Sequence, residues 1–408
     1  MPKLDRPLDG LNFFLADVRD GLGPYLAVWL LTARHWDQAA IGVVMAVGGI
    51  AGLLAQAPAG ALVDASRRKR GLVVVAALLV TGCSLLLPLT PGFWPVAALQ
   101  AVSGAAAALF APAIAAITLG LVGPAAFARR TGRNEAFNHA GNATAAILAG
   151  ALAWRLGPVA VFWLMAAMAA GSVAATLLIP AGRIDHDLAR GLHEGAAAAH
   201  ARPSGLAALL ACRPLLTFAA CCALFHFANA AMLPLVGQKL ALQDRQLGTS
   251  LVAACIVLAQ LVMVPMAMLA GRRADRWGRK PLFLAGFAIL PLRGLLYTLA
   301  DEPLWLLAVQ ALDGVGAGLF GALFPIVVAD LTRGTGRFNV SQGAIATAQG
   351  VGAALSNAVA GAIAAGFGFD AAFLALAAVA GAALALFWLA MPETAPALSG
   401  RAAPRGAL

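Results

Sequence analysis

Charged residues are scarce in this chain. Asp, Glu, Lys and Arg together make up 11% of its 408 residues, whereas hydrophobic residues make up 61%. Soluble globular domains carry roughly 25% charged residues, so the deficit excludes an ordinary soluble protein and indicates a surface that faces lipid. The phosphate-binding pattern G-x-x-x-x-G-K-S/T is also missing, so direct drive by ATP is not expected.

Cysteines are few, and none has the C-x-x-C spacing of a metal or redox motif. All five lie in or near apolar stretches, where cysteine usually acts as a small buried hydrophobe. The His, Asp and Glu residues do not cluster with the spacing of metal ligands or of a nucleophile and its base. We therefore expect no metal site, no cofactor and no enzymatic activity. The cysteines are Cys83, Cys212, Cys221, Cys222 and Cys255.

Long apolar runs recur along the whole chain. About twelve of them are present, each of roughly 20 residues and long enough to cross about 30 Å of hydrocarbon as a helix. The backbone must satisfy its own hydrogen bonds in lipid, so the runs predict helices. The chain is thus predicted to be an all-α integral membrane protein. The runs lie near residues 11–32, 39–63, 71–90, 94–122, 135–156, 158–179, 213–236, 247–270, 281–299, 303–329, 339–366 and 369–391.

The basic residues are distributed unevenly. The formal net charge of +10 would suit a nucleic-acid-binding protein, but no basic stripe with interleaved aromatic residues accompanies it, and we expect no nucleic acid. If the N-terminus is cytoplasmic, all but six of the 28 Lys and Arg lie at the termini or in cytoplasmic loops. This asymmetry predicts a multi-pass protein of the bacterial inner membrane with both termini cytoplasmic. The exceptions are Arg19, Arg34, Arg155, Lys239, Arg245 and Arg293.

One hydrophilic stretch separates six runs from the other six. It carries His186, His193 and His200, which share one face if the stretch is helical. A metal-sensing linker is one interpretation, but we favour a solvated connection because no fixed ligand geometry is evident. The expected parts are a first bundle (1–180), a cytoplasmic linker (181–212), a second bundle (213–394) and a cytoplasmic tail (395–408).

A short basic motif occurs twice. GALVDASRRKR covers 60–70 and GRRADRWGRK covers 271–280, each between two apolar runs. The copies are offset by 211 residues, as Asp64 and Asp275 show (275 − 64), and such a repeat predicts two halves of one architecture. The pattern G-x-x-x-D-x-x-G-R-R/K resembles the loop motif between helices 2 and 3, and between helices 8 and 9, of the major facilitator superfamily. The first copy departs from it, with Arg67 in place of glycine.

This resemblance extends over nearly the whole chain and implies two pseudo-symmetric six-helix bundles. It further implies that Asp64 and Asp275 contact helix ends across the two halves, while Arg68 and Arg279 help to close the cytoplasmic side. The basic residues of the motif also contribute charge that sets the orientation of the loops. The expected gating residues are Gly60, Asp64, Arg68, Gly271, Asp275, Gly278, Arg279 and Lys280.

Three ionisable residues interrupt the first apolar run. Asp17, Arg19 and Asp20 lie within one helical turn, and Asp17 is more than one turn into the run. Charges at this depth are costly, so they mark either paired contacts or a functional cavity. Asp17 and Asp20 share a face, and a desolvated aspartate can bind and release a proton.

Polar pairs at i,i+3 recur in three further runs. With the first run, they fall on runs 1, 4, 7 and 10, which line the central cavity in the family that the chain resembles. The pairs are Gln100 with Ser103, His226 with Asn229, and Gln310 with Asp313. Asn138 and His139 extend this polarity toward the cytoplasmic mouth. The expected substrate and proton pathway comprises Asp17, Arg19, Asp20, Gln100, Asn138, His139, His226, Asn229, Gln310 and Asp313.

Two residues have open interpretations. His226 is either a proton-binding group, since an unperturbed imidazole titrates near pH 6.5, or a hydrogen-bonded core histidine. Arg293 is an intramembrane cation with no evident partner in the sequence, and its long side chain can extend toward the membrane interface.

These features predict a secondary transporter, acting as a monomer, that moves a small organic solute by alternating access. A proton gradient is the expected energy source, and we favour efflux because the expected cavity is largely apolar. The drug exporters of the family often carry Arg four residues before a helix-4 glycine, whereas here Gln100 precedes Gly104. Proton-coupled uptake is the alternative. A non-transporting membrane sensor or a membrane enzyme is the alternative of another class.

Overall fold

The computed structural model describes residues 2–20, 26, 29–30, 34–36, 38–156, 159–192, 212–243 and 245–395. Most of the expected linker, with His193 and His200, and the tail from residue 396 lie outside these residues. The backbone of Asp20 is described, but its side chain is not.

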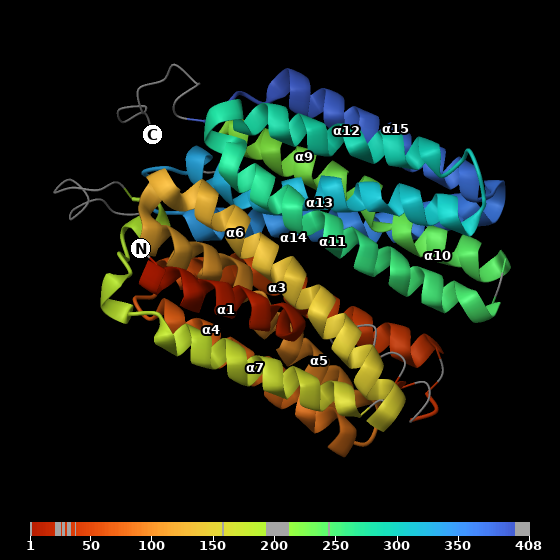
Figure 1. Cartoon of the computed structure of the whole chain (residues 1–408), viewed down its shortest axis with the longest axis horizontal. Coiled ribbons are helices and arrows are strands. Elements are labelled where there is room, and N and C mark those ends of the chain that lie inside the picture. The colour runs from red at the N-terminus through yellow and green to blue at the C-terminus, as the bar shows by residue number, and fades with distance from the viewer. Residues whose placement is uncertain are drawn as a thin grey trace. The chain divides into compact units, whose positions relative to one another are not determined.

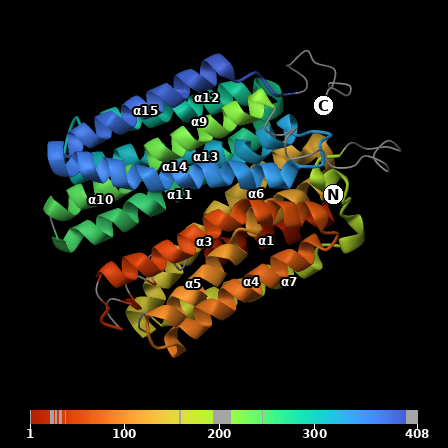
Figure 2. The same cartoon turned by 180° about the vertical axis from the view of Figure 1, so that it is seen from behind.

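The described residues form helices joined by short turns, and no strand occurs among them. Figures 1 and 2 show these helices from opposite sides. The first half of the chain contains α1 (Pro2–Asp20), α3 (Gln38–Ala65), α4 (Lys69–Leu86), α5 (Phe93–Ala107), α6 (Phe110–Leu156) and α7 (Ala160–Leu178). The second half contains α9 (Arg213–Ala230), α10 (Met232–Gln243), α11 (Arg245–Trp277), α12 (Arg279–Leu296), α13 (Pro303–Leu331), α14 (Phe338–Phe367) and α15 (Phe369–Ala390).

Nine segments of the described chain are long and apolar enough to cross a membrane. One of them, Phe93–Leu152, is 60 residues long, or about 90 Å as helix, which is enough for two crossings of the bilayer. Helices α1 and α12 are not among the nine, and both carry several charged residues. Phe93–Leu152 supplies two crossings and the other eight segments supply one each, and α1 and α12 add two more. The all-α architecture is therefore consistent with the twelve predicted spans.

The fourth and fifth predicted spans are joined more closely than the sequence suggests. Helix α6 runs through the basic stretch that separates them, and its break lies at Gly123, where φ is +69°. Left-handed φ is accessible to glycine, and Pro124 suits the first turn of the helix that restarts there. The fifth span therefore begins about ten residues earlier than the apolar run that predicts it.

The structure divides into two compact units, each of which includes a short segment from the other half of the sequence. Unit 1 comprises Met1–Phe127, Ala136–Ala201 and Gly334–Ala344. Unit 2 comprises Ala128–Glu135, Arg202–Arg333 and Ile345–Leu408. The exchanged segments are the part of α6 just after its break and the start of α14.

Helix packing inside each unit repeats with the sequence motif. In unit 1, α3 packs along α5, α1 packs along α7, and α4 contacts both α5 and α7. In unit 2, α11 packs along α13, α9 packs along α15, and α12 contacts both α13 and α15. Adding 211 to the residue numbers of the first set gives the second set. The 211-residue offset is thus a property of the packing as well as of the sequence.

Candidate functional site

A buried ion pair lies within unit 2. The Arg293 guanidinium of α12 donates to Oδ1 of Asp313 on α13, and the two side chains are 2% and 15% exposed. The same guanidinium donates to Oδ1 of Asn229 on α9 at 2.6 Å and contacts the sulfur of Met232 at 3.2 Å. Arg293 therefore has a counter-ion and a polar partner, and the expectation of an unpaired cation is corrected.

Two further residues complete the network around this ion pair. Nε2 of Gln310 donates to Oδ2 of Asp313 at 3.1 Å, so the two residues that the i,i+3 spacing links do interact. The hydroxyl of Tyr297 donates to Oε1 of Gln310. Both Gln310 and Tyr297 are fully buried. Each carboxylate oxygen of Asp313 thus accepts a hydrogen bond, which lowers the cost of holding a charge in this environment.

Close helix packing brings the two charges together. Gly294, next to Arg293, lies against α15, where an added Cβ would be 2.9 Å from the Cβ of Ala377. Gly314, next to Asp313, lies against α11, where an added Cβ would be 2.5 Å from the Ala259 carbonyl oxygen. Small residues allow backbones to approach closely in membrane bundles. The glycines therefore let α12 pack closely on α15 and α13 pack closely on α11, beside the two charged residues.

His226 lies one helical turn before Asn229. Its Nδ1 is 3.0 Å from the Cys222 carbonyl oxygen, and its ring contacts Phe225 and Phe320 at centroid distances of 5.7 and 5.0 Å. These contacts are those of a hydrogen-bonded histidine in an aromatic environment.

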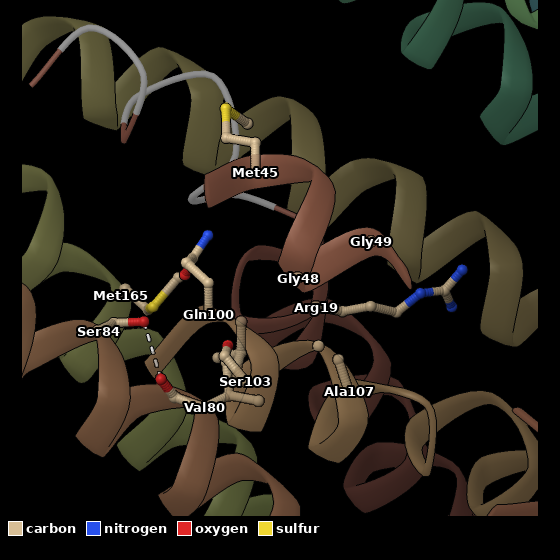
Figure 3. Close-up of a pocket in the computed structure, with 12 residues that line it drawn as sticks. Arg19, Met45, Gly48, Gly49, Val80, Ser84, Gln100, Ser103, Ala107 and Met165 are labelled. Atoms are coloured by element: carbon tan, nitrogen blue, oxygen red, sulfur yellow. Dashed lines mark hydrogen bonds between the residues drawn. The ribbon is translucent and has the colours of Figure 1, made fainter. Parts of the chain in front are cut away.

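A cavity of about 320 Å³ lies within unit 1 (Figure 3). The predicted residues Arg19 and Gln100 both line it, together with Ser84 and Ser103. Figure 3 shows the guanidinium of Arg19 extending past Gly49, away from the amide of Gln100. The rest of the wall is largely apolar: Val18, Met45, Val80, Ala107 and Met165, with Gly48, Gly49 and Gly104. Such a mixture suits a small solute that is partly apolar and carries hydrogen-bonding groups.

The cavity and the ion-pair network coincide at one position of the two repeats. With the 211-residue offset, Asn229 of the network corresponds to Val18, which lines the cavity. The two charged residues, Arg293 and Asp313, correspond to Gly82 and Val102, which do not line it. The charged network of unit 2 is therefore not the counterpart of the cavity of unit 1.

The remaining predicted pathway residues lie elsewhere in the first half of the chain. Asp17 is buried in α1, and Asn138 and His139 are buried in α6. Asp20 ends α1, and its side chain is outside the described residues.

The first copy of the loop motif contacts a helix end. Asp64, at the end of α3, accepts hydrogen bonds from the backbone N–H groups of Asn339 (3.3 Å) and Val340 (2.9 Å) at the start of α14. Nδ2 of Asn339 donates to the same carboxylate at 2.8 Å. Gly60 lies so close that an added Cβ would overlap the Asn339 carbonyl. A carboxylate at this position satisfies free N–H groups and interacts favourably with the helix dipole.

The second copy makes different contacts. Asp275 pairs with Arg279 at 2.7 Å, and Arg279 also binds the buried Asp330 at 3.0 Å. Gly278 has φ of +92°, and an added Cβ would overlap the carboxylate of Glu393. That carboxylate accepts the N–H groups of Arg279 (2.9 Å) and of Lys280 (3.1 Å), which begin α12. Glycine is therefore required here both by conformation and by space.

The basic residues of the two copies have exchanged roles. In the first copy Arg68 is exposed, and the fully buried Lys69 donates to the carbonyl oxygens of Val63 (2.9 Å) and Ser66 (2.8 Å). In the second copy Arg279, which corresponds to Arg68, is the buried residue. The basic residue that donates to carbonyl groups at the end of the preceding helix is thus Lys69 in the first copy and Arg279 in the second, one position apart in the repeat.

The described beginning of the expected linker belongs to unit 1 and contacts residues at and just before the start of α14. The Ala189 carbonyl accepts from Nδ2 of Asn339 at 3.0 Å, and the Gly191 carbonyl accepts from the N–H of Gly334 at 2.6 Å. His186 lies near Lys69 and Arg67. Burial, followed by the charges of these two residues, lowers the pKa of His186 below its ordinary value of 6.5.

Sequence reasoning did not identify the contacts of Tyr297, Asn339 and Glu393. For Arg293, a signal was present: an arginine inside a membrane needs an acidic partner, and Asp313 is the acid of the next span. No comparable signal marks Asn339, since its partner Asp64 is 275 residues away in the sequence.

Comparisons with known proteins agree with this architecture. The sequence profile of the Major Facilitator Superfamily matches residues 10–267 and 215–407. Two uncharacterized MFS-type transporters of Mycobacterium tuberculosis, from strains CDC 1551 / Oshkosh and ATCC 25618 / H37Rv, are each 60% identical over 393 residues, covering 96% of this chain and 94% of theirs.

The solved structure of the proton:xylose symporter XylE has a TM-score of 0.72 at 16% identity, covering 96% of this chain and 95% of its own. For the human organic anion transporter MFSD10 (TETRAN) the TM-score is 0.66 at 17% identity, with coverage of 94% and 97%. The profile and the close relatives establish, and the fold supports, that this chain belongs to the major facilitator superfamily of membrane transporters.

Proposed function

We propose that this chain is a proton-coupled secondary transporter that exports a small organic solute by alternating access. It would lie in the bacterial inner membrane with both termini in the cytoplasm, as the distribution of Lys and Arg favours. The observation that carries the coupling proposal is the Arg293–Asp313 ion pair, which is buried among membrane-spanning helices.

An ion pair of this kind can couple transport to protons because a proton and Arg293 compete for the same carboxylate. While Asp313 is charged, its attraction to Arg293 holds α12 to α13. Protonation of Asp313 removes the attraction and leaves a buried guanidinium without its counter-ion, which is costly. The protonated unit would therefore favour another helix arrangement, and a difference in free energy between two arrangements is what coupling requires.

The cavity of unit 1 is the proposed solute site. Its volume of about 320 Å³ suits a small organic molecule, and the side chains that line it include three apolar ones, the isopropyl group of Val18 and the thioethers of Met45 and Met165. Gln100 and Ser103 would supply hydrogen bonds. We favour export of a solute that is itself partly apolar and partly polar, as this wall is.

The test is a growth-inhibition panel in an efflux-deficient bacterial host. Wild type, Asp313→Asn and Glu302→Gln would be compared at matched expression across antibiotics, dyes, toxic metabolite analogues and metal salts. Glu302 is an exposed acid with no side-chain cap contact, so Glu302→Gln is a control for loss of one carboxylate. Resistance that disappears in Asp313→Asn and persists in Glu302→Gln is the expected result.

Each other outcome changes one part of the proposal. Increased sensitivity to a compound, lost in Asp313→Asn, would indicate uptake instead of export. Resistance that survives in Asp313→Asn would show that the ion pair does not couple transport. Reversal of the quenching of a pH-sensitive dye, on addition of the compound found to inverted vesicles that hold a proton gradient, then measures proton movement directly.

A further inference from the structure

A second charged cluster lies at one end of unit 2. Nζ of Lys239, on α10, pairs with the carboxylates of Asp301 and Asp370, at 3.1 Å for Asp370. The Lys239 side chain is 10% exposed, whereas Asp301 and Asp370 are 69% and 60% exposed. Asp301 belongs to the turn between α12 and α13, and Asp370 begins α15. The buried ammonium of Lys239 therefore links α10 to the turn between α12 and α13 and to the start of α15.

Tyr297 connects this cluster to the Arg293–Asp313 pair. Its carbonyl oxygen accepts a hydrogen bond from Nζ of Lys239 at 3.3 Å, while its hydroxyl donates to Gln310, which in turn donates to Asp313. The Tyr297 ring is fully buried and lies 4.9 Å from the ring of Phe373, centroid to centroid. A ring packed in this way can present its hydroxyl in few directions.

The orientation of Gln310 depends on that hydroxyl. An amide side chain has an accepting oxygen and a donating nitrogen on one planar group. Tyr297 donates to the oxygen, so the nitrogen faces the carboxylate of Asp313. Without this donor, either end of the amide can face Asp313, and the oxygen would repel the carboxylate.

We propose that Tyr297 is a positioning residue of the ion pair, and that Lys239, bound by Asp301 and Asp370, holds Tyr297 in place. The charged and titratable groups near Asp313 and Tyr297 are Arg293 on α12 and the Cys255 thiol on α11, with Lys239 at the other end of Tyr297. On the α9 side the network ends at the neutral Asn229. The importance of this positioning for transport rests on the proposed function, but the positioning itself does not.

The test observes the hydrogen bond to Asp313 without any substrate. Infrared spectra of the full-length protein in lipid vesicles would be recorded at one pH, and the carboxylate stretch of Asp313 identified as the band lost in Asp313→Asn. Tyr297→Phe keeps the ring and removes the hydroxyl. Because the frequency of a carboxylate stretch depends on the hydrogen bonds that the carboxylate accepts, we expect the Asp313 band to shift in Tyr297→Phe, where the Gln310 amide is no longer held with its nitrogen toward Asp313. Thr298→Val removes a hydroxyl from the next residue and should leave the band unchanged.

Two further variants make the result decisive. Gln310→Leu should reproduce the shift, even if Tyr297→Phe does not fold. Lys239→Met should shift the band in the same direction, with no further effect in the Tyr297→Phe background, because it acts through Tyr297. An unchanged band position in both Tyr297→Phe and Gln310→Leu would overturn the positioning role. Additive effects of Lys239→Met and Tyr297→Phe would show that Lys239 acts independently through its charge. A shift of the band with no loss of transport in Asp313→Asn would contradict the proposed function alone.

Discussion

At the scale of single residues, the main finding concerns the partner of Arg293. A guanidinium that is 2% exposed inside a membrane protein requires compensation, and Asp313, Asn229 and Met232 all contact it. Burial makes the two charges depend on each other, because either one alone would be left without a counter-ion. The pair is thus expected to contribute to stability as a unit.

The first prediction tests this dependence. Removing one partner, as in Arg293→Met or Asp313→Leu, should reduce the free energy of unfolding by about 3–5 kcal/mol, whereas replacing both partners with apolar residues should be much less harmful. Thermal unfolding in detergent of the two single variants and the double variant measures the difference. A double variant as unstable as the sum of the singles would show that the charges are not coupled.

At the scale of helices, the two copies of the loop motif differ because the helix starts that they face differ. Asp64 faces Asn339 and Val340, the second and third residues of α14, whose N–H groups are free of helical partners. With the 211-residue offset, the residues that correspond to Asn339 and Val340 are Ala128 and Arg129. Those residues lie more than one turn beyond the break in α6, so their N–H groups are already bonded within the helix. Asp275 accordingly has Arg279 as its partner.

The second prediction follows from this difference. Asp64→Ala should remove the cap of α14 and weaken its docking by about 1–2 kcal/mol, the usual effect of losing an N-terminal cap. Hydrogen exchange of residues 338–344 should become roughly 5- to 30-fold faster, in keeping with that free energy. Asp275→Ala is the matched control and should leave exchange in this segment unchanged. Equal acceleration in both variants would mean that the cap does not hold the segment.

The third prediction concerns the pH dependence of the segment around His186. Burial and the neighbouring Lys69 and Arg67 lower the pKa of His186 below 6.5, so the docked segment binds a proton more weakly than the undocked one. Docking should therefore be fully stable above about pH 6.5 and should weaken as the pH falls below it. Hydrogen exchange of residues 184–192, corrected for the intrinsic pH dependence, measures this. His186→Gln should remove the effect, and a pH dependence that persists in this variant would assign it to another group.

At the scale of the whole molecule, the sequence repeat has become two units with the same helix packing and different interiors. The glycine contacts show the repeat clearly. In unit 1, Gly343 approaches the Gln56 carbonyl, and in unit 2 Gly132 approaches the Ala267 carbonyl, so both pairs are related by the 211-residue offset. The charged network of Arg293 and Asp313 has no such counterpart, since the corresponding residues are Gly82 and Val102. This asymmetry is what suggests different tasks for the two units.

The fourth prediction separates transport from signalling by the chain between the halves. If the protein is a transporter, replacing residues 193–211 with a flexible Gly/Ser segment of the same length should leave most of its transport activity, because such a linker preserves the span without specific contacts. The measurement is either resistance to the compound identified in the growth-inhibition panel or the proton movement that the dye reports in vesicles. Complete loss of function at normal expression would favour a sensor whose signal passes through this segment.

The sequence by itself determined the class of the protein, the number of apolar runs, the repeat and the family. These properties are local or periodic: hydropathy over about 20 residues, charge near the ends of spans, and a motif repeated at a fixed offset. The spacing of Gln310 and Asp313 likewise placed them on one face of α13, and they are hydrogen-bonded in the structure. The fourth apolar run ends near residue 122, beside the break at Gly123, but the fifth run begins about ten residues after the helix restarts, because the helix continues through a basic stretch.

Only the tertiary structure decided which polar residues meet. Arg293 is 20 residues from Asp313 and 64 from Asn229, and Asp64 is 275 residues from Asn339. No periodicity connects residues at such separations; they meet because glycines let particular helices approach and because a helix end is free at one position and not at its counterpart. The same 211-residue repeat therefore accommodates a cavity in one unit and an ion pair in the other, since the side chains that form them are not repeated.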